Sequence, residues 1–285
     1  MIIVSEDGKS FVEISCWEDI ITRPKYESKV DKEQVKLKAI IGKYYLSPKH
    51  PCGISSCGTA HNKGFLVVCQ GGIETNIGDD CGRNIFGVDF KTLENQFNQD
   101  MNIQRYREKI KTYQSRIESY IENIENLKNG DIGGIATYEK IKWFMTKGFE
   151  TKTLHALERK AKLKDNRIFE LQKMDNRDIE LARESGNYET HNKVEIGLLM
   201  GITAAIDYKK LKTLLQVHLS EEVDKFKSID ADTLSYKDLQ FWHNWANRLD
   251  KRIAQAKEII GECKSFLNDK NISTIRSYKT HLGNI

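Results

Sequence analysis

Proline is almost missing from this chain, and its three residues all lie near the N-terminus. Pro24, Pro48 and Pro51 are followed by a stretch from Cys52 to residue 285 that contains none. Helix interiors reject proline, because it lacks an amide N–H and clashes with the preceding turn. The proline-free remainder therefore predicts a long helical region.

Long apolar runs are also missing. The least polar stretch, "EIGLLMGITAAI" (Glu195 to Ile206), is shorter than the ~18–20 residues that cross a membrane, so a buried helix is expected there. The opening "MIIVSEDGKS" has no basic segment followed by a long apolar one, which argues against a signal peptide. We therefore expect a cytoplasmic protein that does not associate with membranes.

A strong excess of one charge is absent too. The formal net charge of the 285 residues is +4, which permits nucleic-acid binding without arguing for it. A chain of this length holds one large domain or two modest ones. In a reducing compartment its six cysteines are expected to be metal ligands, core residues or reactive thiols rather than disulfides.

The first part of the chain has the patterns of strands. "SFVEISCW" alternates polar and apolar residues, "VKLKAIIGKYYL" is also strand-like, and "GFLVVCQGGIETNIG" predicts a hairpin that turns at Gly71–Gly72. "DDCGRNIFGVDF" then has the acidic residues of a first helical turn. We expect a β-rich domain over residues 1–97, with a boundary near Phe97 to Gln99.

Two heptad series characterise the second domain, residues 98–285. Steps of three and four alternate in both, as in a coiled-coil seam, and predict long helices near 101–128 and 234–268. Shorter helices are expected at about 135–147, 151–174, 176–185 and 194–218. The series are Ile103, Tyr106, Ile110, Tyr113, Ile117, Tyr120, Ile124 and Leu127, and then Leu239, Trp242, Ala246, Leu249, Ile253, Ala256, Ile260, Cys263 and Leu267.

These coiled-coil-like helices can pack in two ways. They can pair with each other inside one all-α domain, or one can form the seam of a homodimer. Bulky, polar-tipped tyrosines at the d positions of the first series favour packing within the chain over a two-stranded dimer. The solution mass distinguishes the two. The expected fold class is α+β, a small zinc-stabilised β-rich module followed by an all-α domain.

"HPCGISSCGTAHNKGF" (His50 to Phe65) is the chemically richest stretch. Cys52, Cys57 and, further on, Cys81 are each followed by glycine, whose backbone freedom allows N–H groups to turn toward a thiolate sulfur. Zinc takes four such soft or borderline ligands in a tetrahedron. The expected start of a helix at Cys81 would also stabilise a thiolate there.

This order, a Cys/His loop, a hairpin and a cysteine at a helix start, resembles a treble-clef zinc domain over residues 50–90. "TNIGDDCGRNIFG" also resembles uncharacterised phage and plasmid zinc-binding proteins. A treble clef usually has Cys-x-x-Cys at both ends, whereas this chain has Cys-x4-Cys and then one cysteine. We therefore recruit His61 and expect Cys52, Cys57, His61 and Cys81 to hold a structural Zn²⁺. His50 and Cys69 are the alternatives for one ligand, although Cys69 is better explained as a buried strand residue.

Other interpretations of these cysteines remain. They can be free thiols in an ordinary loop. Cys57 can be a nucleophile with His61 as its base. A catalytic zinc would need an open coordination position and a base such as Glu74, Asp79 or Asp80. We favour the structural zinc, because four protein ligands close the site, and expect no enzymatic activity.

Basic residues interleave with aromatic ones between residues 138 and 167. Such a mixture suits phosphate contacts and base stacking, although a solvated face of an amphipathic helix has the same composition. The residues concerned are Lys140, Lys142, Lys147, Arg159, Lys160, Lys162, Lys164 and Arg167.

Three functions follow from these patterns. The first hypothesis is a zinc-containing, nucleic-acid-associated binding protein of phage, plasmid or bacterial antiviral-conflict origin. The second is a protein–protein adaptor or inhibitor that acts through its helical hairpin. The third is a zinc- or cysteine-dependent enzyme.

Overall fold

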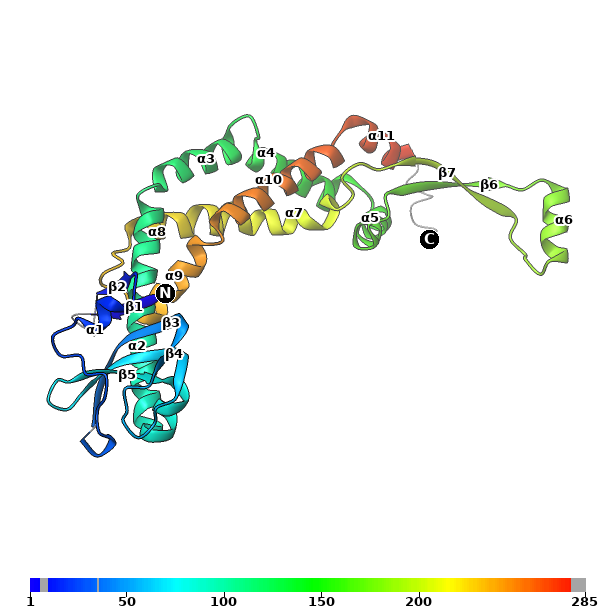
Figure 1. Cartoon of the computed structure of the whole chain (residues 1–285). Coiled ribbons are helices and arrows are strands. Elements are labelled where there is room, and N and C mark those ends of the chain that lie inside the picture. The colour runs from blue at the N-terminus through cyan, green and yellow to red at the C-terminus, as the bar shows by residue number, and fades with distance from the viewer. Residues whose placement is uncertain (6–9, 35, 278–285) are drawn as a thin grey trace. The chain divides into compact units, whose positions relative to one another are not determined.

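The computed structural model describes residues 1–5, 10–34 and 36–277 (Figure 1). The chain forms two units, the first made of Met1–Thr112 and Asp230–His243 and the second of Tyr113–Ile229 and Asn244–Ile285. The predicted boundary at residues 97 and 98 lies inside the helical segment between Gly87 and Gln114, and the division into domains 1–97 and 98–285 stays a prediction.

The first unit is built on a five-stranded antiparallel sheet of order β2-β1-β3-β4-β5. The predicted hairpin is confirmed: β4 and β5 pair around Gly71 and Gly72, which both have positive φ. The alternating "SFVEISCW" and the strand-like run before Pro51 are confirmed as β2 and β3. The strands are β1 (Ile2–Ser5), β2 (Phe11–Ile14), β3 (Leu37–Pro51), β4 (Ala60–Cys69) and β5 (Glu74–Gly78).

Helix α2 (Asp79–Gln114) begins directly after β5, where the acidic residues predicted it. Its first part packs on the sheet: Phe90 is fully buried and meets Phe65 of β4 edge to face, with ring centroids 5.4 Å apart. A Cβ atom at Gly82 would lie 2.5 Å from the Phe90 ring, so only glycine permits this approach. Gly87 interrupts the helix with a φ of 53°. The start of α2, which carries Cys81, is therefore fixed against the sheet.

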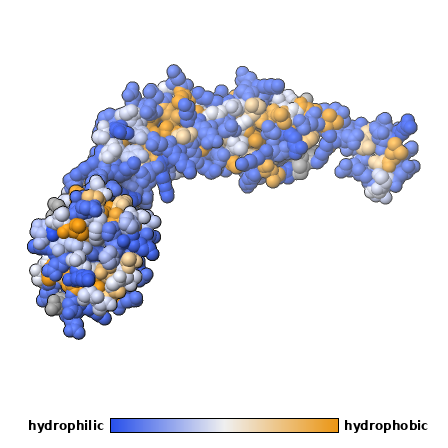
Figure 2. Space-filling model, viewed as in Figure 1, coloured by the Kyte–Doolittle hydropathy of each residue, from blue (hydrophilic) through white to orange (hydrophobic). Residues whose placement is uncertain are grey.

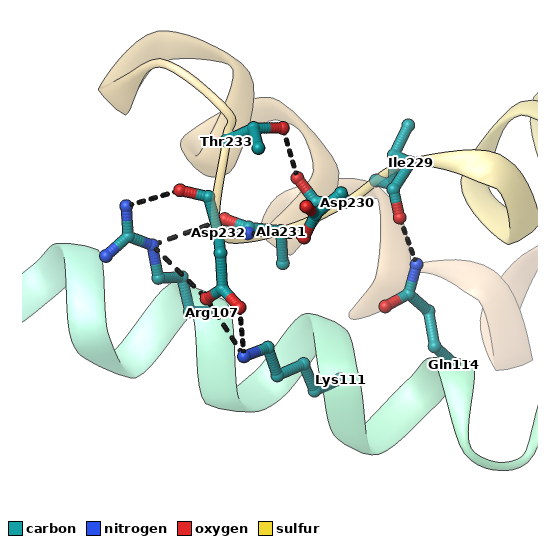
Figure 3. A network of polar contacts seen from close by, with 8 residues as sticks. All are labelled: Arg107, Lys111, Gln114, Ile229, Asp230, Ala231, Asp232 and Thr233. Atoms are coloured by element: carbon teal, nitrogen blue, oxygen red, sulfur yellow. Dashed lines mark hydrogen bonds and ion pairs between the residues drawn. The ribbon is translucent and has the colours of Figure 1, made fainter.

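Residues 230–243 pack on the later part of α2 (Figure 3). Arg107 donates to the carbonyl oxygens of Ala231 and Asp232, at 3.2 and 3.0 Å, and Lys111 forms an ion pair with the Asp232 carboxylate at 2.7 Å. Tyr106 lies against His243, with ring centroids 4.3 Å apart. The first helix α1 (Glu18–Ile21) and the 3₁₀ turn η1 (Lys32–Gln34) complete this unit.

The second unit is mainly helical. Its core contains large apolar side chains from most of its helices, among them Ile141, Leu157, Phe226 and Phe266. The helices are α3 (Ile117–Asn129), α4 (Gly134–Trp143), the π-helical η2 (Phe144–Gly148), α5 (Thr151–Leu163), α6 (Asn176–Glu184), α7 (Ala204–Thr213), the π-helical η3 (Leu214–Glu221), α8 (Glu222–Ser228), α10 (Leu249–Phe266) and α11 (Asp269–Ser277).

The expectation of an all-α second domain is wrong. An antiparallel hairpin of β6 (Arg167–Lys173) and β7 (His191–Leu198) projects from the second unit, with α6 between its strands. The predicted helix 151–174 ends at Leu163, because Lys164 adopts a left-handed C-cap with a φ of 54°. The predicted helix 194–218 begins only at Ala204, because residues up to Leu198 pair with β6.

The two long heptad helices are each interrupted. The first series is divided between α2 and α3, which break near Ser115–Arg116, and the second between α9 (Tyr236–Ala246) and α10. The series residues are nonetheless buried or half-buried in their units. This burial agrees with packing inside the chain, while coiled-coil pairing and a homodimer seam stay predictions.

Among the residues that the structure describes, none of the helices combines the length and apolar character that a membrane crossing needs.

Candidate metal centre

Three of the predicted ligands come together in the first unit. The sulfur atoms of Cys52, Cys57 and Cys81 all lie within 4.8 Å of one another. Cys52 follows the end of β3, Cys57 lies in the loop before β4, and Cys81 is in the first turn of α2. The loop between β3 and β4 and the first turn of α2 therefore converge on one point that could hold a metal ion.

Backbone hydrogen bonds fix the loop that carries the first two cysteines. The Cys52 amide donates to the Thr59 carbonyl at 3.0 Å, and the Cys57 amide donates to the Ile54 carbonyl at 3.0 Å. The Gly53 amide donates to the carbonyl of Asn76 in β5 at 2.8 Å. Because β5 leads directly into α2, the same contact sets the loop against the turn that carries Cys81.

Backbone amide groups influence two of the thiols. The amides of Ile54 and Gly78 act to lower the pKa of Cys52 against the larger effect of its burial, and the amide of Thr59 helps to lower the pKa of Cys57. Gly58 has a φ of 63°, which a residue with a side chain rarely adopts. Of the three glycines that follow Cys52, Cys57 and Cys81, Gly58 is the one with the positive φ that the sequence suggested. Donors of this kind stabilise thiolates, the form that binds metal.

The three thiols differ in acidity. Hydrogen bonds from Cys81 and from the Thr59 amide lower the pKa of Cys57 to about 7. Burial and the neighbouring thiols raise the pKa of Cys81 to about 12, and burial raises the pKa of Cys52. Three adjacent thiolates repel one another, so the thiols by themselves do not all ionise at neutral pH. A divalent cation removes that obstacle, because it offsets their charge.

His61, the predicted fourth ligand, is not in this group of three. Its Nδ1 lies 3.1 Å from the Thr59 carbonyl oxygen and its Nε2 lies 2.6 Å from the Tyr44 hydroxyl. A carbonyl only accepts, so Nδ1–H donates to Thr59 and Nε2 accepts from Tyr44. Burial lowers the pKa of His61, which keeps the ring neutral. His61 as a zinc ligand stays a prediction, and it would require Nε2 to exchange the Tyr44 hydroxyl for the metal.

The same contacts show how the proposed catalytic pair, Cys57 and His61, is placed. Cys57 lies 2.9 Å from the Cys81 sulfur, while both His61 ring nitrogens have other partners. Two of the three proposed bases are engaged as well, since Glu74 forms an ion pair with Arg23 at 2.6 Å. Asp79 pairs with Arg83 at 3.0 Å.

The two alternative ligands lie elsewhere. Cys69 is buried in β4 with 1% exposure and belongs to the hydrophobic core of the sheet, as expected for a small strand residue. The His50 ring stacks on Trp17, with ring centroids 4.4 Å apart.

Sequence analysis missed a buried polar chain beside the cysteines. The Tyr26 hydroxyl donates to Asn76 Oδ1 at 2.7 Å, and Asn76 Nδ2 donates to the Tyr44 hydroxyl at 3.2 Å, which in turn reaches His61. Asn76 is 1% exposed. Burial raises the pKa of both tyrosines, that of Tyr26 to about 12. A polar residue inside a strand that is buried on both faces is the signal that could have revealed the chain.

The predicted basic residues all lie in the second unit, between α4 and β6. Lys160 is set apart from the others, because it is 4% exposed and donates to the Arg167 carbonyl at 2.7 Å and to Asp165 at 3.3 Å. Lys142 pairs with Glu139, and Arg167 pairs with Asp165. The other five are exposed, and the described part of the chain gives them no ion pair: Lys140, Lys147, Arg159, Lys162 and Lys164.

Comparisons with protein-family models, with curated proteins and with solved structures gave no match to this chain. The resemblance to treble-clef and phage or plasmid zinc proteins therefore stays a prediction, and the arguments that follow depend on the geometry of this chain alone.

Proposed function

We propose that the protein is a zinc-containing, nucleic-acid-binding protein whose zinc has a structural role. The convergence of Cys52 and Cys57 from one loop with Cys81 from the start of α2 supports the metal site. Thiolates select zinc over hard cations such as Mg²⁺ or Ca²⁺. Zinc there joins the loop after β3 to the first turn of α2, and its binding energy becomes folding energy of the first unit.

The spacing of the sulfur atoms suits zinc after a small adjustment. A tetrahedral site with Zn–S bonds of ~2.3 Å places two sulfurs about 3.8 Å apart. The Cys57 and Cys81 sulfurs are 2.9 Å apart as a hydrogen-bonded pair, so zinc would separate them by less than 1 Å. The fourth position belongs to His61 Nε2 or to a water molecule. X-ray absorption distinguishes three sulfurs plus nitrogen from three sulfurs plus oxygen, and His61→Ala should alter the spectrum only in the first case.

The charge of residues 138–167 carries the nucleic-acid proposal. This segment holds nine of the 45 basic residues and four of the 41 acidic ones, so its charge is +5 while the remainder of the chain has −1. On α5, Lys152, His155, Arg159 and Lys162 are exposed at steps of three and four, which places them on one face of the helix. A basic helix face of this kind fits a phosphate backbone.

A salt titration tests the nucleic-acid proposal. Affinity for duplex and single-stranded DNA and for RNA should fall linearly in log–log form with salt concentration, because binding releases counterions. The double variant Arg159→Gln/Lys162→Gln should reduce the slope by about 1.8, because each phosphate that a cation neutralises accounts for ~0.9. The matched control Lys251→Gln/Lys257→Gln removes two exposed lysines from α10 and should leave the slope unchanged. Absent or salt-insensitive binding would contradict the proposal.

The projecting β-hairpin of β6 and β7, with α6 between its strands in the chain, favours a second candidate function, a protein–protein adaptor. Helix α6 has no buried residue, and a two-stranded hairpin is only marginally stable alone in water. Leu181 and Tyr188 are 56% and 80% exposed, and Figure 2 shows apolar side chains on this part of the unit. A protein partner captured from nuclease-treated lysate by the wild type, but not by Leu181→Ser, would support this candidate over nucleic-acid binding.

A further inference from the structure

A pocket of about 530 Å³ lies at the N-terminal end of α5 in the second unit. Its lining combines two cations, one carboxylate, an aromatic ring and a hydroxyl. These residues are Lys147, Gly148, Phe149, Glu150, Thr153 and Arg276. The lining comes from the end of η2, the two-residue turn that follows it, the first turn of α5 and, with Arg276, from α11, so the pocket depends on the folded unit.

The amide groups at this helix end are available to a ligand. The first hydrogen bond of α5 runs from the Leu154 amide to the Glu150 carbonyl at 3.0 Å. The amides of Thr151, Lys152 and Thr153 precede that bond, and no side chain caps them in the described structure. Three free N–H groups and the positive end of the helix dipole attract an anion.

Thr153 provides an independent sign of a ligand. It is 1% exposed, lines the pocket and forms no hydrogen bond with its side chain in the part of the chain that the structure describes. The Thr153 hydroxyl oxygen is not fully enclosed, so the small exposed part of this residue lies at the hydroxyl. The hydroxyl therefore faces the pocket without a partner among the described residues, and a ligand oxygen there would satisfy it.

The charges and rings around the pocket indicate which anion it suits. Lys147 and Arg276 are both exposed, and the described residues offer neither an ion pair. Together they outweigh Glu150, the acidic lining residue. Phe149 packs against Phe144, with ring centroids 5.5 Å apart, and the adjoining Trp143 is 50% exposed. Guanidinium, ammonium and amide donors suit phosphate oxygens, and the aromatic side chains suit a base.

We infer that this pocket is a phosphate-binding site, formed by the α5 amide groups, Thr153, Lys147 and Arg276, which takes a phosphate group of a nucleotide. The inference deepens the proposed function, because it names a specific contact within the basic segment. The same chemistry would also bind a free phosphate group, and the two sources require separate measurements.

Inorganic phosphate is the first probe, applied to the whole chain with amide NMR signals as the readout. Sodium chloride at matched ionic strength is the reference. Phosphate should shift the amides of Thr151, Lys152 and Thr153 in a saturable way. Arg276→Gln should weaken the response at least threefold, and Thr153→Val should do the same if it folds. The control Lys257→Gln should not change it. No saturable shift at these amides, or a response unaffected by Arg276→Gln, would overturn the inference.

A short single-stranded oligonucleotide is the second probe, and it separates the two proposals. Binding that shifts the same amides, with a salt slope smaller by about one in Arg276→Gln, supports both. Oligonucleotide binding that leaves these amides and the slope of the variant unchanged overturns the pocket, while the nucleic-acid proposal stands. A response to inorganic phosphate without any oligonucleotide binding supports the pocket as a site for a free phosphate group and contradicts the nucleic-acid proposal.

Discussion

Adjacent basic residues on α5 should respond in opposite ways to substitution. Lys160 is buried and Arg159 is exposed, although the sequence marks both as nucleic-acid contacts. Lys160→Met should destabilise the second unit and leave nucleic-acid affinity unchanged. Arg159→Gln should reduce affinity and leave stability within about 0.5 kcal/mol.

The contacts of Lys160 set the size of the effect. Its ammonium donates to the Arg167 carbonyl at 2.7 Å and to the Asp165 carboxylate at 3.3 Å, and it lies 5.8 Å from the centroid of the Phe169 ring. Methionine keeps most of the apolar stem but neither hydrogen bond. Hydrogen bonds to charged groups contribute about 1.5–3 kcal/mol, and Asp165 keeps Arg167 as a partner at 2.9 Å, so we expect a destabilisation of about 2 kcal/mol.

Thermal unfolding followed by circular dichroism measures this destabilisation. In a unit of this size, about 2 kcal/mol corresponds to a fall in Tm of about 4–8 °C. The salt slope for DNA should be that of the wild type in Lys160→Met and lower by about 0.9 in Arg159→Gln. A Lys160→Met protein with unchanged Tm and a reduced slope would refute the assignment of Lys160 to the interior.

Further outcomes follow from other residues. Burial raises the pKa of Asp165, but hydrogen bonds from Arg167 and Lys160 outweigh it and hold the pKa at about 2, below the ordinary 3.8. The carboxylate should thus contribute about 1–2 kcal/mol above pH 4, and this contribution disappears as the pH falls toward 2. In denaturant titrations, wild type and Asp165→Asn should differ in stability above pH 4 and become equal as the pH falls toward 2. Phe90→Ala should cost about 3–5 kcal/mol, measured in urea, because it empties the contact between sheet and helix. A Cβ atom at Gly261 on α10 would meet no neighbour, so Gly261→Ala should stabilise the protein by about 0.5–1 kcal/mol. Gly58 has a positive φ, so Gly58→Ala should lower both stability and metal affinity. Equal effects of the two substitutions on Tm would contradict this reasoning.

Local patterns predict the sheet and the grouping of three cysteines well. The Gly71–Gly72 turn, the strand-like alternation and the acidic helix start each depend on neighbours in sequence, and the structure has all three. The convergence of Cys52, Cys57 and Cys81 was also predictable, because a hairpin followed directly by a helix brings its two ends together. His61 could not be assigned, because its orientation depends on Tyr44, seventeen residues away in the chain.

The hairpin of β6 and β7 shows where local patterns fail. Residues 151–174 contain enough helix formers for one helix, and the left-handed turn at Lys164 has no glycine to mark it. The apolar stretch Glu195 to Ile206 also suits a helix, yet its first four residues belong to β7, which pairs with β6 through backbone groups. Lys160 was misjudged for a related reason, because a lysine is expected at the surface and only the fold provides its partners.

Metal content tests the central claim most directly. Plasma mass spectrometry of protein purified without chelator should give one zinc per chain for the wild type and for the control Cys16→Ser, whose cysteine lies outside the cluster. Cys81→Ser should contain little or none. Wild-type protein without zinc, or the same zinc content in all three proteins, would contradict the account and leave the three thiols to be explained by their reactivity.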